Sequence, residues 1–221
     1  MRPVVVKLGG AVAAAAADFV LALAGRQPVV VVHGAGAQIS AELERRGLEV
    51  SFVSGRRVTS AAALQVVRAS LADVNAAVCA ALGERAVSLF GDEIGLRATL
   101  IPELGYVGEA EPSAPPAITI ALSAGLIPVV APLAAGPLNV NADEAAAALA
   151  VGLDAERLLF VSDVPGLLLG GAVTAAISVT EAQRLLDANV LSGGIVPKLE
   201  AALGATRNGV RAEIGATAVV A

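Results

Sequence analysis

The sequence predicts an α/β protein of three layers, in which a central, mainly parallel sheet lies between two layers of helices. Two observations indicate this class. Apolar runs of strand length alternate with Ala- and Leu-rich segments of helix length. The apolar runs are also continuous, which is typical of strands that helices cover on both faces. The length of 221 residues suits one large domain or a protein of two lobes.

Each expected strand is followed by its expected helix. These pairs lie at 3–8 and 12–25, at 28–33 and 36–46, at 126–133 and 142–153, and at 157–164 and 180–189. Residues 86–110 differ, because short apolar pieces are interrupted by "GDEIG" and "ELGYVG". There we expect hairpins that flank a site.

The composition excludes several classes of protein. The longest uncharged run, 112–142, contains six prolines and is therefore a poor membrane span. A net charge of −5 without a basic cluster argues against binding of nucleic acid. No basic segment and apolar segment of a leader precede the first strand, so we expect a cytoplasmic protein. The single cysteine, Cys79, is interpreted as a buried, inert thiol in a reducing compartment.

Lysine is rare in this chain. Lysine and arginine together number 15, yet the only lysines are Lys7 and Lys198. An arginine side chain is a broad planar fork, whereas a lysine side chain is a compact and mobile point charge. The two remaining lysines therefore indicate positions that need an ammonium group.

Three turns that follow strands are rich in glycine or small residues: "KLGGAV", "HGAGAQIS" and "SDVPGLL". Ligands of open α/β sheets bind at such turns. Glycine lets backbone N–H groups approach an anion. A tight turn explains any one of these segments alone, but the three together favour the handling of phosphate. None of them matches the P-loop or the complete dinucleotide fingerprint.

Two predicted helices begin with further candidate functional residues. In "NVNADEAAAALA", Asn141 or Asp143 could cap a helix while Glu144 complements its dipole, or Asp143 could orient a nearby cation. For this stretch alone, capping is the simpler interpretation. In "SGGIVPKLEAAL", Lys198 lies at the start of a helix, where a cation is unfavourable and a functional role is therefore indicated.

No set of side chains suggests nucleophilic catalysis or a metal site. His33, the single histidine, has no partners at metal-ligand spacing, so we expect it to pack or to form a hydrogen bond. The charged residues of the turns indicate positioning and charge stabilisation instead. Phosphoryl transfer depends on these effects, because charge spreads over oxygens in its transition state.

These segments, together with "GRRVT", "GYVG" and "IPVVAPL", occur in the order and approximate spacing of the acetylglutamate kinases of the amino acid kinase superfamily. The resemblance covers nearly the whole chain, and "NVNAD" and "GG-x-x-PK" are its most specific parts. It implies phosphorylation of the γ-carboxylate of N-acetyl-L-glutamate by ATP, in arginine biosynthesis. It also implies one domain over 1–221, with a substrate-binding and dimerisation lobe at 1–138 and a nucleotide-binding lobe at 139–221.

The resemblance also implies roles for single residues. Lys7 and Lys198 would neutralise the transferring phosphoryl group, and Asp143 would organise both lysines. The implied substrate-binding residues are Ala35, Gly36, Arg57 and Asn139. The implied nucleotide-binding residues are Gly9, Gly10, Asp163, Val164, Pro165, Gly166, Leu167, Leu168, Val190, Leu191 and Ser192. The implied cofactor is ATP with Mg²⁺ held mainly by the nucleotide phosphates, without a metal site in the protein.

Ala35 replaces the middle glycine of the family's "HGGG", which puts a methyl group where substrate and phosphate approach. The first strand begins at about residue 3, without the N-terminal helix that accompanies arginine feedback in hexameric members. We therefore expect a homodimer that arginine does not inhibit. Two alternatives remain open: a relative acting on a carrier-linked aminoadipate or glutamate, and a non-catalytic regulatory homologue that binds nucleotide.

Overall fold

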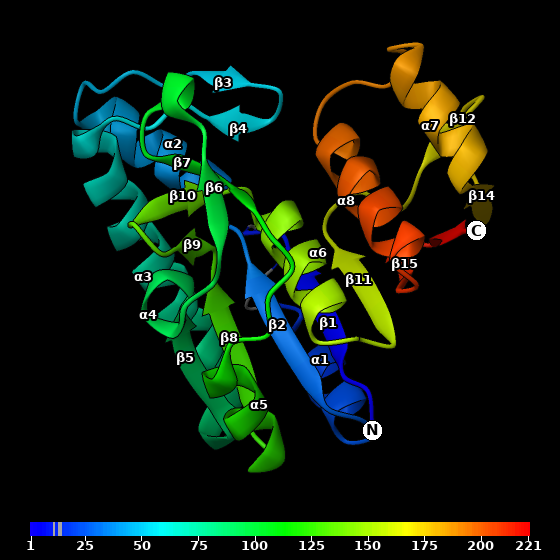
Figure 1. Cartoon of the computed structure of the whole chain (residues 1–221), viewed down its shortest axis with the longest axis horizontal. Coiled ribbons are helices and arrows are strands. Elements are labelled where there is room, and N and C mark those ends of the chain that lie inside the picture. Colours follow the sequence, from blue (N-terminus) through cyan, green and yellow to red (C-terminus); the bar gives the residue numbers. More distant parts are fainter. Residues whose placement is uncertain (11, 13–14) are drawn as a thin grey trace.

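The computed structural model describes residues 1–221 except 11, 13 and 14. Its largest element is a twisted sheet of eight strands (Figure 1). In spatial order these are β14 (Ala176–Ser178), β16 (Thr217–Val220), β15 (Arg211–Ile214), β11 (Arg157–Val161), β1 (Val4–Leu8), β2 (Val29–His33), β8 (Ile127–Ala131) and β5 (Ala86–Phe90). All neighbouring pairs are parallel except β15 with β16. The predicted mainly parallel sheet is confirmed.

Helices cover both faces of this sheet. One face packs against α1 (Ala17–Ala24), α2 (Gly36–Arg45) and α3 (Ala61–Leu82). The other packs against α5 (Pro116–Ser123), α6 (Ala142–Gly152), α7 (Val179–Asp187) and α8 (Ile195–Arg207). Because side chains alternate along a strand, Val4 and Val6 enter the first layer while Val5 enters the second. The predicted three layers are therefore present.

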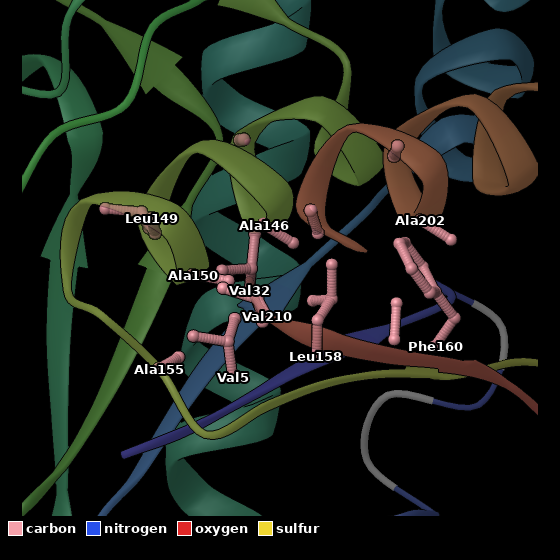
Figure 2. Packing of buried hydrophobic residues seen from close by; sticks show 14 of the residues in the cluster. Val5, Val32, Ala146, Leu149, Ala150, Ala155, Leu158, Phe160, Ala202 and Val210 are labelled. Atoms are coloured by element: carbon pink, nitrogen blue, oxygen red, sulfur yellow. The ribbon is translucent and has the colours of Figure 1, made fainter. Parts of the chain in front are cut away.

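Small side chains let helices lie close to the sheet. Figure 2 shows Ala146 and Ala150 of α6 and Ala202 of α8 above the valines and leucines of the strands. Phe160 of β11 fills the space below α8 (Figure 2) and is fully buried. With so few aromatic residues, this core depends on the close approach of alanine-rich helices.

A smaller sheet and two hairpins lie outside the central sheet. The smaller sheet contains β6 (Ala98–Leu100), β7 (Val107–Ala110), β10 (Leu138–Val140) and β9 (Leu133–Ala134). The hairpins pair β3 (Phe52–Val53) with β4 (Arg56–Arg57), and β12 (Leu168–Leu169) with β13 (Ala172–Val173). Short segments that complete this region are α4 (Gly91–Ile94) and the 3₁₀ turns Gly83–Arg85 and Pro102–Leu104.

The prediction of hairpins for 86–110 is only partly right. β6 and β7 form an antiparallel pair, as expected. However, β5 pairs in parallel with β8 and forms an edge of the central sheet. Its edge position leaves its side chains half-buried, so its sequence lacks the long apolar run of the central strands.

Helices α1 and α3 differ from the others in their start and in their length. The helix expected at 12–25 begins only at Ala17, and part of the alanine run before it lies outside the described residues. Among the described helices, the segment Ala61–Arg85 is long and apolar enough to cross a membrane by length and composition alone. One side of this helix packs on the central sheet, as in the core helix of a globular protein.

The division into lobes at residue 139 stays a prediction. Strands from both sides of that boundary belong to one sheet, because β1 pairs with β2 on one edge and with β11 on the other. β1 therefore lies where the strand order reverses, with strands of the first part of the chain on one side of it and strands of the last part on the other. Such a switch point leaves a crevice beyond the carboxyl end of the strand, and Lys7 lies at that end of β1.

Candidate functional site

Lys7 is buried within the central strand β1. Its side chain is 8% exposed, and its Nζ lies 2.8 Å from Oδ1 of Asp143. A buried ammonium needs a compensating charge, which this carboxylate supplies. Lys7 follows Val5 at the strand period of two, so it lies on the face that packs against α6.

The sequence around Asp143 starts helix α6 at the required place. Asn141 is the N-cap residue, and its Oδ1 accepts hydrogen bonds from the backbone N–H groups of Asp143 and Glu144 at 2.8 and 3.4 Å. The capping interpretation of Asn141 is therefore confirmed. Capping fixes the first turn of the helix, so that Asp143 points to the end of β1.

Lys198 approaches the same carboxylate from helix α8. Its Nζ lies 3.7 Å from Oδ2 of Asp143, and it donates a hydrogen bond to the carbonyl oxygen of Gly194 at 3.1 Å. The side chain is 11% exposed. The structure thus brings the two lysines and Asp143 together, as predicted.

The charges at this point do not balance. Lys7 and Lys198 supply two positive charges to the single negative charge of Asp143, and all three side chains are nearly buried. Burial lowers the pKa of Lys198, and the charge of Lys7 lowers it further, whereas Asp143 and Asp163 raise it. The uncompensated positive charge favours the binding of an anion.

A cavity of about 190 Å³ opens beside these charges. Its lining combines the ends of β1 and β2 with β4, β10 and the start of α6. Among the predicted site residues, it includes Lys7, Gly10, Ala35, Gly36, Arg57, Asn139 and Asp143. Seven of the predicted residues, far apart in sequence, therefore share one cavity.

Arg57 offers an unused donor in this cavity. Its Nη2 donates to the carbonyl oxygen of Gly36 at 3.0 Å and to Oγ of Ser40 at 2.8 Å, and its guanidinium lies 4.5 Å from the centre of the Phe52 ring. Its Nη1 is buried without a hydrogen-bond partner among the described residues. Burial also lowers the pKa of Arg57. A bound carboxylate would accept from Nη1 and compensate the buried charge.

The glycines at the ends of β1 and β2 differ in their surroundings. A Cβ on Gly10 would lie 2.7 Å from the carbonyl oxygen of Gly34, closer than a side chain permits. The N–H of Gly9 donates to the carbonyl oxygen of Val161 at 2.9 Å, so a phosphate would compete with that bond. Nothing lies within 4 Å of the position of a Cβ on Gly36, which leaves space above it.

The other predicted residues vary in exposure. Asn139 belongs to β10, and its Nδ2 donates to Oγ1 of Thr59 at 3.0 Å. The predicted nucleotide segment begins after β11, where Asp163 and Pro165 are exposed and Val164 is half-buried, while Gly166 and Leu167 are buried. The N–H of Leu167 donates to Oγ1 of Thr217 at 2.8 Å.

The remaining predicted nucleotide residues are at the surface or near it. Leu168 is exposed in β12. Val190 and Ser192 are exposed before α8, and Leu191 packs against the core beneath that helix. The side chain of Leu167 is therefore buried, whereas those of Asp163, Leu168, Val190 and Ser192 are accessible to a ligand.

His33 is held by a buried asparagine that the sequence interpretation missed. Nδ2 of Asn75 lies 3.0 Å from Nε2 of His33 and donates to the carbonyl oxygen of Val129 at 3.0 Å. Burial lowers the pKa of His33 to about 4, so the ring is neutral at pH 7. The expectation of a hydrogen-bonding histidine is confirmed. A polar residue in the apolar stripe "LADVNAAV" was the signal for Asn75.

Neither Cys79 nor a cluster of potential metal ligands forms a second site among the described residues. Cys79 is half-buried rather than fully buried, and burial raises the pKa of its thiol, which favours the unreactive form. Within the described residues, no group of three His, Cys, Asp or Glu side chains is arranged to hold a metal ion.

Comparison with known proteins identifies the family. The model of the amino acid kinase family matches residues 2–215. The chain belongs to the amino acid kinase family. The predicted resemblance to acetylglutamate kinases is also confirmed, since the chain is 42% identical to the acetylglutamate kinase of Rubrobacter xylanophilus, over 97% of this chain and 88% of that protein. It is 39% identical to the acetylglutamate kinase of Chloroflexus aurantiacus, over 83% and 78% of the two chains.

Solved structures share the fold of this chain. A crystal structure of a protein from Streptococcus mutans UA159 has a TM-score of 0.91 and 29% identity, covering 99% of this chain and 98% of that one. The N-acetylglutamate synthase of Neisseria gonorrhoeae, complexed with coenzyme A and N-acetyl-glutamate, has a TM-score of 0.85 at 24% identity. This chain covers 59% of that synthase, and at this identity the likeness supports the fold alone.

Proposed function

We propose that this member of the amino acid kinase family transfers the γ-phosphoryl group of ATP to the γ-carboxylate of N-acetyl-L-glutamate, the acetylglutamate kinase reaction of arginine biosynthesis. The observation that carries the proposal is the buried set of two ammonium groups on one carboxylate, beside a cavity that contains a guanidinium donor with no partner among the described residues. Identity of 42% to an acetylglutamate kinase supports the choice of substrate.

The substrate is proposed to bind through its ends. Nη1 of Arg57 clamps the carboxylate that does not react, and Asn139 hydrogen-bonds the acetamido group. Gly36 leaves room for the chain of the substrate, and Ala35 narrows the cavity beside it. The reacting γ-carboxylate then faces Lys7, because this residue and Arg57 line the same cavity.

The reaction needs no general base. The γ-carboxylate is ionised at pH 7, and its oxygen attacks the γ-phosphorus while the bond to the bridging oxygen of ADP breaks. Negative charge is present on both partners, so repulsion must be reduced before they meet. Lys7 and Lys198 reduce it, and Asp143 keeps both ammonium groups in place. The neutral His33 takes no part in this chemistry.

The nucleotide is proposed to extend from Lys198 over the start of α8. Gly9 and Gly10 lie near the phosphates, Asp163 to Leu168 form one side of the nucleotide site, and Val190 to Ser192 form another. Mg²⁺, when bound with the nucleotide, neutralises part of the phosphate charge. The phosphates are its proposed ligands, since the described residues contain no cluster that would hold it alone.

The finer features of the proposal follow the family resemblance. We propose lobes at 1–138 for substrate and dimerisation and at 139–221 for nucleotide, a homodimer, and a place in the cytoplasm.

The test is formation of an acyl phosphate, trapped with hydroxylamine, on N-acetyl-L-glutamate, glutamate and N-acetylaspartate. Strong turnover on N-acetyl-L-glutamate alone, lost in Lys198→Arg, is the expected result. The arginine variant keeps the charge but not the compact shape of the ammonium. A protein that binds ATP without turnover of any of these substrates would contradict the proposal and would favour a carrier-linked substrate or a regulatory role.

A further inference from the structure

The substrate clamp Arg57 belongs to a hairpin with few backbone bonds to hold it. Strands β3 and β4 have two residues each and pair with one another, outside both larger sheets. Phe52 and Val53 on this hairpin are more than half exposed. An isolated two-stranded hairpin is marginally stable, so its position must depend on side-chain contacts.

Arg56 supplies such contacts on the side opposite to Arg57. Both arginines line the substrate cavity, but successive residues of a strand point to opposite faces. The guanidinium of Arg57 therefore turns to α2, whereas that of Arg56 turns to α6 and β7. Nε of Arg56 lies 2.9 Å from Oε1 of Glu144 in the first turn of α6. Its Nη2 lies 3.1 Å from Oε1 of Glu109 on β7.

The pair with Glu144 is the more important of the two. The side chains of Arg56 and Glu144 are 22% and 21% exposed, whereas that of Glu109 is 63% exposed. Water therefore screens the bond to Glu109 much more than the bond to Glu144. Glu200 also lines the cavity of about 410 Å³ on this side, where Arg56 is the only cation among the described lining residues.

Two further contacts seat the turn of the hairpin on the same part of the protein. Nδ2 of Asn141, the N-cap of α6, donates to the carbonyl oxygen of Gly55 at 3.1 Å. Gly55 also packs against Pro197, since a Cβ on this glycine would lie 3.5 Å from Cβ of Pro197. Pro197 precedes Lys198, so the hairpin reaches the helix that carries the second ammonium group.

We propose that Arg56 is a positioning residue, which holds the β3–β4 hairpin on the first turn of α6 through Glu144 and so fixes Arg57 in register with Lys7, Asp143 and Lys198. The inference rests on the proposed function for the identity of the substrate. The two neighbouring arginines then have different roles. Arg57 binds the substrate, and Arg56 keeps the hairpin in the docked conformation that allows this binding.

This role affects substrate binding more than chemistry. If loss of the ion pair lowers the population of the docked hairpin to about a tenth, the apparent affinity for the substrate falls about tenfold. Once the substrate is bound, the hairpin is docked again and the reacting groups are unchanged. KM for N-acetyl-L-glutamate should therefore rise about tenfold, with little change in kcat or in KM for ATP.

The kinetic test compares five variants with the wild type. Arg56→Gln and Glu144→Gln should each raise KM for N-acetyl-L-glutamate, and the double variant should be no worse than the poorer single one, because both remove the same interaction. Arg56→Lys should restore part of the affinity, since it keeps the charge but not both directed bonds. Arg46→Gln is the matched control, because Arg46 pairs with Glu42 at the C-terminal end of α2, whereas Arg57 contacts the N-terminal half of that helix.

A second readout does not depend on catalysis. Hydrogen exchange of residues 51–57 without substrate should be faster in Arg56→Gln than in the wild type or in Arg46→Gln. Unchanged exchange with unchanged KM would overturn the inference. An equal loss of kcat/KM for both substrates, accompanied by a lower Tm, would also overturn it, because that pattern indicates a merely structural role. If the wild type does not phosphorylate N-acetyl-L-glutamate, the proposed function fails, and exchange alone decides whether Arg56 holds the hairpin.

Discussion

Replacement of Asp143 by asparagine should destabilise this protein strongly, although the two side chains have nearly the same shape. The carboxylate lies 2.8 Å from the ammonium of Lys7 and 3.7 Å from that of Lys198. At an effective dielectric constant of about 20, Coulomb's law gives gross attractions of about 6 and about 4.5 kcal/mol at these distances. Asparagine would remove the carboxylate that the two nearly buried ammonium groups share.

Desolvation offsets much of that gross attraction, so the net loss is smaller. Removal of one partner of a buried ion pair lowers the free energy of unfolding by about 3–5 kcal/mol. In a protein of this size, each kcal/mol lowers Tm by about 2–4 °C, which gives a fall of about 6–20 °C. Thermal unfolding followed by circular dichroism at pH 7 measures this quantity. The matched control is Asp154→Asn, because the side chain of Asp154 is 82% exposed in its pair with Arg2.

The pH dependence provides the sharper check. Burial already lowers the pKa of Lys198 in the folded protein, and loss of Asp143 removes a group that raises it. The unfolded chain then binds more protons than the folded chain in the alkaline range, so the free energy of unfolding of Asp143→Asn rises with pH. A loss of less than about 1 kcal/mol at pH 7, no larger than an exposed pair is worth, would refute the reasoning. So would a deficit that does not shrink as the pH is raised.

Three other changes have defined outcomes. Because the pKa of Lys198 is lowered and activity needs its ammonium form, kcat/KM measured across the alkaline range should fall with rising pH below the ordinary lysine range. Gly10→Ala should reduce kcat/KM at least tenfold in steady-state assays, since its methyl group would meet the carbonyl oxygen of Gly34 at 2.7 Å. Asn75→Leu should lower the free energy of unfolding by about 2–4 kcal/mol in urea titration, because it leaves buried acceptors without donors, whereas Asn208→Leu on the surface should have little effect.

Local sequence predicted the central parts of the fold well. The strands around Lys7 and His33 are continuous apolar runs, and such runs have few alternatives to a sheet covered on both faces. The charge cluster was also predictable, because two lysines in an arginine-rich chain stand out by composition. The cap at Asn141 follows from its position before an alanine-rich helix.

The features that the sequence did not predict depend on tertiary contacts. β5 is an edge strand, so its half-buried side chains lack the apolar pattern that identifies its neighbours. Arg56 resembles any surface arginine until the fold brings Glu144, 88 positions later, within 2.9 Å. The bond between Asn75 and His33 spans 42 positions and joins a helix to a strand. Pairings of this kind carry no local signal.

The pairing of β1 with β11 has a consequence for synthesis of the chain on the ribosome. β1 emerges well before its partner on one edge, Arg157–Val161, and before Asp143, the counterion of Lys7. Until those residues appear, the nascent chain contains an incomplete strand edge and an uncompensated ammonium group. Contacts so distant in sequence form late and slowly. Early intermediates should therefore remain open at β1, which makes that edge the place where chaperones or self-association would act.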